Sequence, residues 1–405
     1  MLSDAKKICL GAINDSLVQD NVINYLQTLD IKQNVYLLAI GKAAYDMAKA
    51  ASEVINIKKG IVITKYGHSK GDIINTTIYE AGHPISDENT IIATRSVTEL
   101  FSHLNGDDIV IFLLSGGASA LFEDSDIGLQ ELQDINDQML KKGLNIEEIN
   151  TIRKKLSNVK GGKLANICKP AKIYSLILSD VLSDRLDMIG SGPTAKDLTS
   201  VEDALAIIKK YDLKLSDKAI DIIKNNKNIN VDNCDNHIIG SVKLLYKAAC
   251  KHADYLGYKV IGLKDDIDLD CHKAADYLLL EIQKHLNDKE KVALIMSGET
   301  TVNVKGKGLG GRNQELIFYL IKHIKDMNNV LVMSLGSDGT DGPTDAAGAY
   351  CDGMSYQKLI DNNIDYDEIL NNNDSYHGLQ AIDGLIFTGA TGTNVNDICV
   401  ALING

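Results

Sequence analysis

Short apolar segments alternate with longer segments of helical periodicity along most of the chain. Four runs of five or six mostly apolar residues occur in the first half, at 35–40, 60–64, 109–114 and 174–178. Such runs are typical of strands that are buried on both faces of a parallel sheet. The intervening segments with helical spacing include 42–57, 88–104 and 129–142. This alternation predicts a doubly wound α/β domain.

A polar segment near the middle of the chain interrupts this pattern. Residues 225–236 contain six Asn and two Asp in twelve positions, a composition that favours turns over packing. After this segment the strand–helix alternation resumes, and residues 292–296 and 300–305 are expected to pair as a hairpin. We therefore predict two α/β domains, residues 1–235 and residues 236–405.

The composition is that of a globular protein and excludes two other classes. The longest apolar runs have about six residues, whereas a membrane-spanning helix needs ~20, so we expect no membrane span. The formal net charge is −13, which argues against a nucleic-acid partner because phosphate binding needs clustered Lys and Arg. Seven dispersed cysteines without a CxxC pair, and no apolar signal-peptide core, favour reduced thiols and a cytoplasmic location.

Glycine-rich loops follow several expected strands, and the carboxyl ends of parallel strands are where α/β sheets bind ligands. Five loops at expected strand ends are candidates, 41–44, 115–119, 179–181, 190–194 and 336–342, and all of them except 179–181 contain glycine. The loop at 115–119 reads SGGAS, and its consecutive backbone N–H groups could hold a phosphate. A tight turn without a ligand is the alternative. Because such loops recur at five strand ends, we favour a ligand-binding edge.

The basic residues point to candidates for anion binding. Only four of the 42 basic residues are Arg, and Arg312, within the segment GGRNQE, is the strongest candidate because its planar fork binds carboxylate or phosphate bidentately. Lys42 directly follows a buried strand, where a merely solvated lysine is less expected. Four further residues could add positive charge near the site, with surface solubility as the alternative: Arg153, Lys154, Lys160 and Lys163.

Acidic residues beside the glycine-rich loops are candidates for binding Mg²⁺, which typically takes one or two carboxylates plus substrate phosphates. Asp180 ends the apolar strand of the segment SLILSD. Asp338, Asp341 and Asp345 lie in or next to the loop at 336–342. Stabilisation of a turn is the alternative role for each carboxylate, and Asp180 fits that alternative least.

Several familiar catalytic motifs are absent from the sequence. It contains no Walker A motif, no HRD or DFG sequence, no GxSxG and no HExxH. Gly306, Gly308 and Gly311 match the GxGxxG dinucleotide fingerprint. The strand expected before this match is half polar, however, and no acidic residue ends the next strand at the usual distance. A nicotinamide-dependent dehydrogenase is therefore the weaker alternative.

Taken together, the motifs resemble the type-2 glycerate kinases, whose C-terminal part is known as the MOFRL domain. The resemblance extends over almost the whole chain. It is carried by nine segments in order: AIGKAA (39–44), EAGHPISDENT (80–90), LLSGGASAL (113–121), INTIRKKLSNVKGGKLA (149–165), LSDVLSD (178–184), GSGPT (190–194), SGETTVNVKGKGLGGRNQE (297–315), GSDGTDGPTDAAGA (336–349) and TGATGTNVND (388–397).

This resemblance implies ATP- and Mg²⁺-dependent phosphorylation of D-glycerate to 2-phosphoglycerate. It further implies a Rossmann-like N-terminal domain, a second α/β domain with a mixed sheet, and an active site in the cleft between them. In this family the lysine of GKAA and the arginine of GGRNQE are taken as catalytic, and these motifs place the roles on Lys42 and Arg312. Both residues are also the candidates chosen above from the sequence alone.

The remaining site residues are expectations of the same hypothesis. Asp180 would bind Mg²⁺, and a general base is left open among Asp338, Asp341 and Lys42. The alternatives to a kinase are an NAD(P)-dependent hydroxypyruvate reductase and a non-catalytic metabolite-binding protein. The residues expected to line the ATP site are Ser115, Gly116, Gly117, Ala118, Ser119, Ser191, Gly192 and Thr194.

Overall fold

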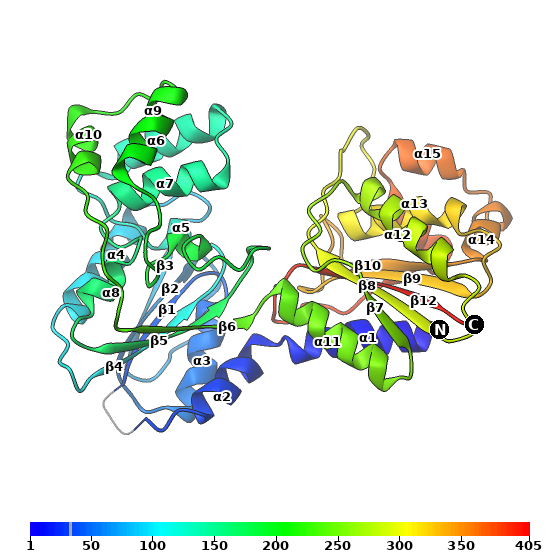
Figure 1. Ribbon diagram of the computed structural model, residues 1–405, viewed down its shortest axis with the longest axis horizontal. Coiled ribbons are helices and arrows are strands. Elements are labelled where there is room, and N and C mark those ends of the chain that lie inside the picture. The colour runs from blue at the N-terminus through cyan, green and yellow to red at the C-terminus, as the bar shows by residue number, and fades with distance from the viewer. Residues whose placement is uncertain (32–34) are drawn as a thin grey trace. The chain divides into compact units, whose positions relative to one another are not determined.

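The structure is a computed structural model that describes residues 1–31 and 35–405. The chain forms two compact units, one of residues Val18–Ile239 and one that combines Met1–Leu17 with Gly240–Gly405 (Figure 1). The domain boundary that we predicted after residue 235 falls inside a strand of the first unit, four residues before the observed division. The first 17 residues belong to the second unit and not, as predicted, to the first.

The unit Val18–Ile239 is built on a six-stranded sheet in which the first five strands run parallel. The strand order is β3-β2-β1-β4-β5-β6, which is the order of a Rossmann fold and confirms the predicted fold class. Every residue of β4 is buried, which explains its continuous apolar sequence. The strands are β1 (Val35–Ile40), β2 (Ile57–Lys65), β3 (Thr76–Ala81), β4 (Ile109–Leu114), β5 (Lys172–Leu178) and β6 (Cys234–Gly240).

Four helices of this unit, α6, α7, α9 and α10, gather beside the sheet around a small apolar core of their own (Figure 1). Reciprocal capping boxes begin two of them, Asn145 with Glu148 at α7 and Ser200 with Asp203 at α9. The helices are α2 (Val18–Gln27), α3 (Ala44–Val54), α4 (Glu88–Phe101), α5 (Ala118–Leu121), α6 (Leu129–Lys141), α7 (Ile146–Leu156), α8 (Lys163–Ile167), α9 (Val201–Lys210) and α10 (Asp217–Lys224), with a 3₁₀ turn, η1, at Ile189–Ser191.

The second unit contains a mixed six-stranded sheet of order β11-β10-β9-β12-β8-β7. Its strands pair antiparallel except β7 with β8, so the predicted mixed sheet is confirmed. The strands are β7 (Lys259–Gly262), β8 (Val292–Gly298), β9 (Val330–Gly336), β10 (Gly348–Asp352), β11 (Leu385–Ile386) and β12 (Asp397–Ile403). The helices are α1 (Leu2–Asp15), α11 (Val242–Tyr255), α12 (Cys271–His285), α13 (Arg312–His323), α14 (Ser355–Asp361), α15 (Tyr366–Asn371) and α16 (Ser375–Gln380).

The hairpin expected from residues 292–296 and 300–305 is wrong. The antiparallel partners of β8 come from β12, near the end of the chain. Residues 302–305 form no strand, because their backbone is held by another loop: the N–H groups of Lys305 and Gly306 donate to Asn373 Oδ1 at 2.8 and 3.0 Å. The alternation of apolar and polar residues there does not mark a half-buried strand, since the apolar Val304 is itself 67% exposed.

Two further expectations concern thiols and membranes. All seven cysteines are free, and five of them are buried. In the described part of the chain, no helix is both long and apolar enough to cross a bilayer.

Candidate functional site

The loops that follow β1 and β4 meet at one edge of the first sheet. β1 and β4 are neighbours, and the strand order reverses between them, so this edge is the topological switch point where open α/β sheets bind ligands. Two hydrogen bonds fasten the loops together: Lys42 N–H donates to Gly116 O at 2.9 Å, and Ala43 N–H donates to Ser115 Oγ at 3.1 Å. The GKAA and SGGAS segments therefore form one structural element.

Gly116 and Gly117 bring three functional side chains close to the backbone of this element. A Cβ atom on Gly116 would lie only 2.2 Å from Asp180 Oδ2, and one on Gly117 would lie 3.2 Å from Lys42 Cε and 3.0 Å from the His83 ring. Within the described residues, the N–H groups of Gly116 and Gly117 have no hydrogen-bond acceptor. Two free amides beside an exposed ammonium group form a suitable cradle for phosphate oxygens.

The helix after this loop is too short to contribute much to phosphate binding. Helix α5 has only four residues, Ala118–Leu121, so few peptide dipoles align at its N-terminus. Any phosphate binding here therefore depends on the free amides and on Lys42, and only weakly on a helix dipole.

His83 is a site residue that the sequence reasoning did not single out. Its ring lies over Gly117, next to the side chain of Lys42. A histidine side chain ordinarily has a pKa of about 6.5. Burial lowers the pKa of His83 below that value, and the nearby Lys42, Lys65 and His68 lower it further by smaller amounts. His83 is therefore neutral at pH 7. Its position in the segment EAGHP was the available signal, but a single histidine in a loop did not reveal which strand end it would face.

Asp180, the residue predicted to bind Mg²⁺, lies beside the two glycine amides. Its carboxylate is exposed and lies against Gly116. Among the described residues, no group of three or more His, Cys, Asp or Glu side chains could hold a metal ion by itself. Mg²⁺ usually binds through one or two carboxylates, water and the phosphates of its substrate, so the role of Asp180 as a Mg²⁺ ligand stays a prediction.

The other residues predicted to bind ATP support the cradle from behind. Ser115 is buried, and the Ala118 side chain packs against Gly190. Ser119 Oγ lies 3.1 Å from Ser191 Oγ, which in turn donates to Asn150 Oδ1 at 2.9 Å.

The SGPT loop lies deeper than a nucleotide-lining loop would. Thr194 is only 2% exposed, and its hydroxyl lies between Ser175 Oγ at 3.2 Å and Asn236 Oδ1 at 2.8 Å. Gly192 is buried next to the backbone of Asp187. These contacts give the loop a supporting role, and a direct contact of Ser191, Gly192 or Thr194 with ATP stays a prediction.

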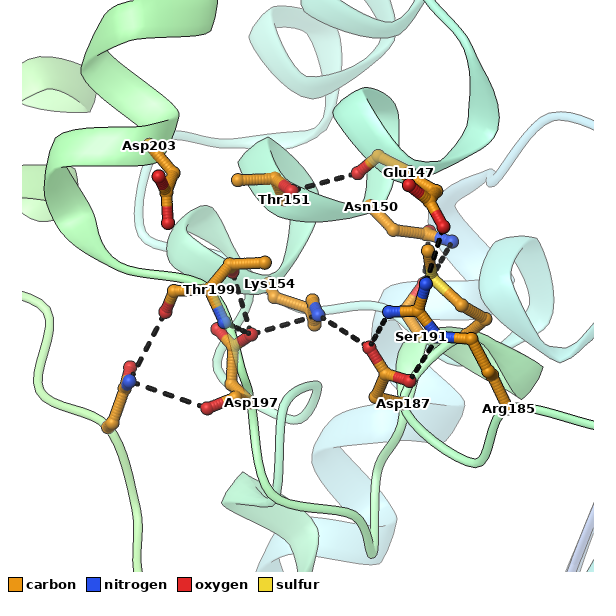
Figure 2. Close-up of polar contacts among 12 residues, drawn as sticks. Glu147, Asn150, Thr151, Lys154, Arg185, Asp187, Ser191, Asp197, Thr199 and Asp203 are labelled. Atoms are coloured by element: carbon orange, nitrogen blue, oxygen red, sulfur yellow. Dashed lines mark hydrogen bonds and ion pairs between the residues drawn. The ribbon is translucent and has the colours of Figure 1, made fainter.

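Two of the lysines expected to attract anions, Lys154 and Lys160, are instead buried in ion pairs, as is their neighbour Lys155. Lys154, on α7, lies between Asp197 and Asp187, at 2.8 and 3.5 Å (Figure 2). Lys155 binds Asp197 at 2.8 Å, and Lys160 binds Glu123 at 2.6 Å. All three lysine side chains are at most 1% exposed. Their charges are neutralised locally, so they do not contribute to the attraction of a substrate.

The cluster around Lys154 fixes the loop before η1 against α7. Arg185 binds both oxygens of Asp187 and also reaches Glu147 on α7 (Figure 2). Burial alone would raise the pKa of Asp197, but hydrogen bonds from Lys154 and Lys155 outweigh burial and hold that pKa below its usual value. The stabilisation by Asp197 is therefore present above pH ~4, the pKa of an unfolded Asp, and is lost as pH falls through the lower folded pKa.

We expect Asp197→Ala to be strongly destabilising, because it leaves Lys155 buried without a carboxylate and Lys154 with only its longer contact to Asp187. Breaking a buried ion pair in this way costs about 3–5 kcal/mol, measurable by urea denaturation followed by circular dichroism. The matched control is Asp212→Asn, which removes a pair with Lys214 in which both side chains are 75% exposed. If the two variants unfold at the same urea concentration, the buried cluster does not stabilise the fold.

In the second unit, Arg312 is held by two carboxylates. Arg312 is the first residue of α13, and its guanidinium donates to both oxygens of Asp397, at 2.6 and 3.0 Å, and to Glu299 Oε1 at 2.6 Å. Asn396 Nδ2 donates to the other oxygen of Glu299 at 2.9 Å. Arg312 is therefore a positioned cation and not a free side chain. Sequence reasoning missed Glu299 and Asp397, although both lie in segments that carried the resemblance.

Burial and charge oppose each other at this ion pair. Burial raises the pKa of Asp397 to about 7, although the bond to Arg312 acts in the opposite direction. Burial alone would lower the pKa of Arg312, but Asp397 and Glu299 outweigh it and raise that pKa further. The pair is therefore fully ionised only above neutral pH.

The GxGxxG match does not create a dinucleotide site. The carboxylate of Asp341 accepts hydrogen bonds from the backbone N–H groups of Asn313 and Gln314, at 3.1 and 2.8 Å. These are amides at the start of α13, the kind that a pyrophosphate group would need. Asp338 instead stabilises a turn by accepting from Thr340 N–H at 3.0 Å.

A cavity of about 700 Å³ lies beside Arg312 within the second unit. Its lining includes Arg312, Asp338 and Thr340, together with Gly308 and Gly310 from the loop before α13. A small organic molecule fits this volume, and each terminal nitrogen of Arg312 keeps one further N–H group beyond its bond to Glu299 or Asp397.

Comparisons with known proteins identify the family of the chain. Residues 5–224 match a family described as a domain of unknown function (DUF4147), and residues 292–397 match the MOFRL family. A D-glycerate 2-kinase from Thermotoga maritima is 46% identical, over 91% of this chain and 90% of that protein. A putative hydroxypyruvate reductase from Agrobacterium vitis is 34% identical, over 91% of this chain and 98% of that protein.

The similarity extends to three dimensions. The crystal structure of a glycerate kinase from Thermotoga maritima superposes with a TM-score of 0.95 at 42% sequence identity, and the match covers 99% of both chains. By sequence and by fold, this chain belongs to the glycerate 2-kinase (MOFRL) family.

Proposed function

We propose that this protein is a D-glycerate 2-kinase that transfers the γ-phosphoryl group of ATP to the 2-hydroxyl of D-glycerate in the presence of Mg²⁺. The observation that carries the proposal is the convergence of Lys42, Asp180 and the free amides of Gly116 and Gly117 at the switch point of a Rossmann-type sheet. The names of similar kinases from other organisms support the same reaction.

The reaction forms a bond from the glycerate oxygen to Pγ and breaks the bond from Pγ to the bridging oxygen of ADP. Catalysis of such a transfer depends mainly on positioning and on stabilising charge at the phosphoryl oxygens. Lys42 and the amides of Gly116 and Gly117 would bind the phosphate oxygens. Asp180 would hold Mg²⁺, which neutralises phosphate charge when it is bound.

The acceptor site is assigned to the cavity beside Arg312. Glycerate carries a carboxylate, and a guanidinium group binds carboxylates more specifically than an ammonium group does. Glu299 and Asp397 would keep Arg312 in one orientation. Of the three groups considered as a general base, Asp341 is the least suitable because its carboxylate caps α13.

The direct test is phosphorus NMR of the product formed from D-glycerate, ATP and Mg²⁺. The expected spectrum contains ADP and 2-phosphoglycerate. The absence of any new phosphomonoester signal, or the appearance of 3-phosphoglycerate alone, would contradict the proposal. NADH absorbance with hydroxypyruvate should stay constant, because the amides that would bind the cofactor's pyrophosphate are occupied by Asp341.

His83 should make ATP binding depend on pH. Phosphates bound beside His83 would raise its pKa, so ATP should bind more tightly as pH falls from 7.5 to 5.5 (about two units around the usual histidine pKa). Calorimetric titration of ATP into the wild type and His83→Gln at several pH values measures this effect. Because the terminal phosphate itself titrates near pH ~6, only the difference between the proteins reports on His83. Parallel profiles would place the phosphates away from His83.

A further inference from the structure

The first unit contains a cavity next to the SGGAS loop. It has a volume of about 310 Å³ and is bordered by α6, by the turn that contains Pro84 and Ile85, and by Arg153 of α7. Ser119 and Ala120 line it as well, so the cavity begins where the phosphate cradle ends. Its volume is at the lower end of the range for small-molecule sites, about 300–1,000 Å³.

Hydrogen bonds fix three polar side chains of this cavity, those of Gln133, Asn136 and Arg153. Each of the three retains an unused hydrogen-bonding group. Gln133 Nε2 donates to Ser86 O at 2.7 Å, and Asn136 Oδ1 accepts from Arg153 Nε at 2.7 Å. Within the described residues, no partner binds the carbonyl oxygen of Gln133, the amide nitrogen of Asn136 or the two terminal nitrogens of Arg153. One acceptor and one donor, three residues apart on α6, thus border a space that also contains a planar guanidinium.

The charge of this cavity favours a neutral ligand over an anion. Three carboxylates line it, those of Glu123, Asp134 and Asp137. Glu123 is paired with Lys160 at 2.6 Å and Asp137 with Lys141 at 2.7 Å, which leaves Asp134 and Arg153 with no net charge between them. Two exposed apolar side chains at its border, Ile85 and Leu140, are 66% and 65% exposed. Burial also lowers the pKa of Arg153, a sign that its charge is only partly compensated.

We propose that this cavity binds the adenine base of the nucleotide whose phosphates occupy the Gly116–Gly117 cradle. Arg153 stacks on the base, as guanidinium groups commonly do on nucleobases. Gln133 accepts a hydrogen bond from the exocyclic amine, and Asn136 donates to a ring nitrogen. Adenine offers such a donor and acceptor side by side, whereas the corresponding edge of guanine offers two acceptors. This assignment rests on the proposed kinase function and adds a preference for ATP over GTP.

Calorimetry with three ligands tests this assignment: ATP, GTP and inorganic tripolyphosphate, which has no base. Arg153→Met removes the guanidinium group and keeps most of the aliphatic stem. Leu140→Trp fills the border of the cavity from an exposed position, so it should not disturb folding. Each variant should weaken ATP binding by about 10-fold or more, the size expected when one base-stacking contact is lost. Binding of tripolyphosphate should be unchanged, and the wild type should prefer ATP to GTP.

The matched control is Ile92→Trp, which changes a residue on α4 that is 55% exposed and lies outside this cavity. It should bind all three ligands as the wild type does. Unchanged ATP affinity in both test variants, or an equal loss of ATP and tripolyphosphate, would overturn the assignment of the base. Loss of phosphate or glycerate binding in Arg153→Met would identify the cavity as an anion site instead. Failure of the proposed function looks different, since the wild type would then bind ATP and form no phosphoglycerate.

Discussion

Lys42→Ala should lower kcat for glycerate phosphorylation by about 10²–10³-fold, the usual effect of removing one preorganised charge that stabilises a transition state. The reason is its location: the lysine follows β1 at the switch point, and its stem lies against Gly117 beside the two free amides. Because the side chain is exposed, its removal should leave the unfolding transition unchanged. Steady-state kinetics and urea denaturation of the same preparation separate the two effects.

Lys49→Ala is the matched control for this variant. Lys49 is also exposed, and it lies on α3, the helix that follows Lys42, so it changes the net charge equally without touching the cradle. Its kcat should equal that of the wild type. Lys42→Arg should retain only part of the activity, because a guanidinium group of different shape cannot occupy the position of the ammonium group. A kcat near the wild-type value in Lys42→Ala would exclude Lys42 from phosphoryl transfer.

Four strands of the first sheet, β1, β2, β4 and β5, were readily predictable because strands buried on both faces contain little besides apolar residues. The expected bounds of β1 and β4 agree with the structure residue for residue. The position of α1 was not predictable in the same way. Its buried face, which includes Ala5, Ile8 and Ala12, shows that the helix packs against something, but not that its partners are α11 and β12, more than 200 residues away.

In the candidate site, too, features set by the local sequence could be predicted, whereas contacts between residues far apart in the sequence could not. The glycines and Lys42 could be identified because loop composition is a local property. Lys154 and Lys160 were wrongly expected to attract anions because the carboxylates that neutralise them are not close in sequence. Their partners, Asp197 and Glu123, lie about 40 residues away along the chain. A lysine-rich segment looks the same whether its charges face a substrate or buried carboxylates. His83 was missed for this reason as well, since only folding brings it to Gly117.

Arg312→Ala should reduce kcat/KM for D-glycerate by about 10²–10³-fold, with a smaller effect on the affinity for ATP. The variant removes the cation of the 700 Å³ cavity and leaves Asp397 buried without its partner. The pKa of Asp397, already about 7 in the presence of Arg312, should then rise further, so the carboxyl group takes up a proton at neutral pH. Arg95→Ala is the control, because Arg95 is 67% exposed and forms only a surface pair with Asp124.

The pH profile distinguishes a positioned guanidinium from a simple positive charge. Asp397 is ionised above its pKa of about 7 and protonated below it, so its hold on Arg312 weakens as pH falls. We therefore expect wild-type kcat/KM for glycerate to decrease as pH falls through neutrality. Asp397→Asn cannot ionise, so its profile should lack this step and stay near the lower level throughout. If both proteins show the same acidic decrease, another group causes it, and Asp397 does not control the orientation of Arg312 during catalysis.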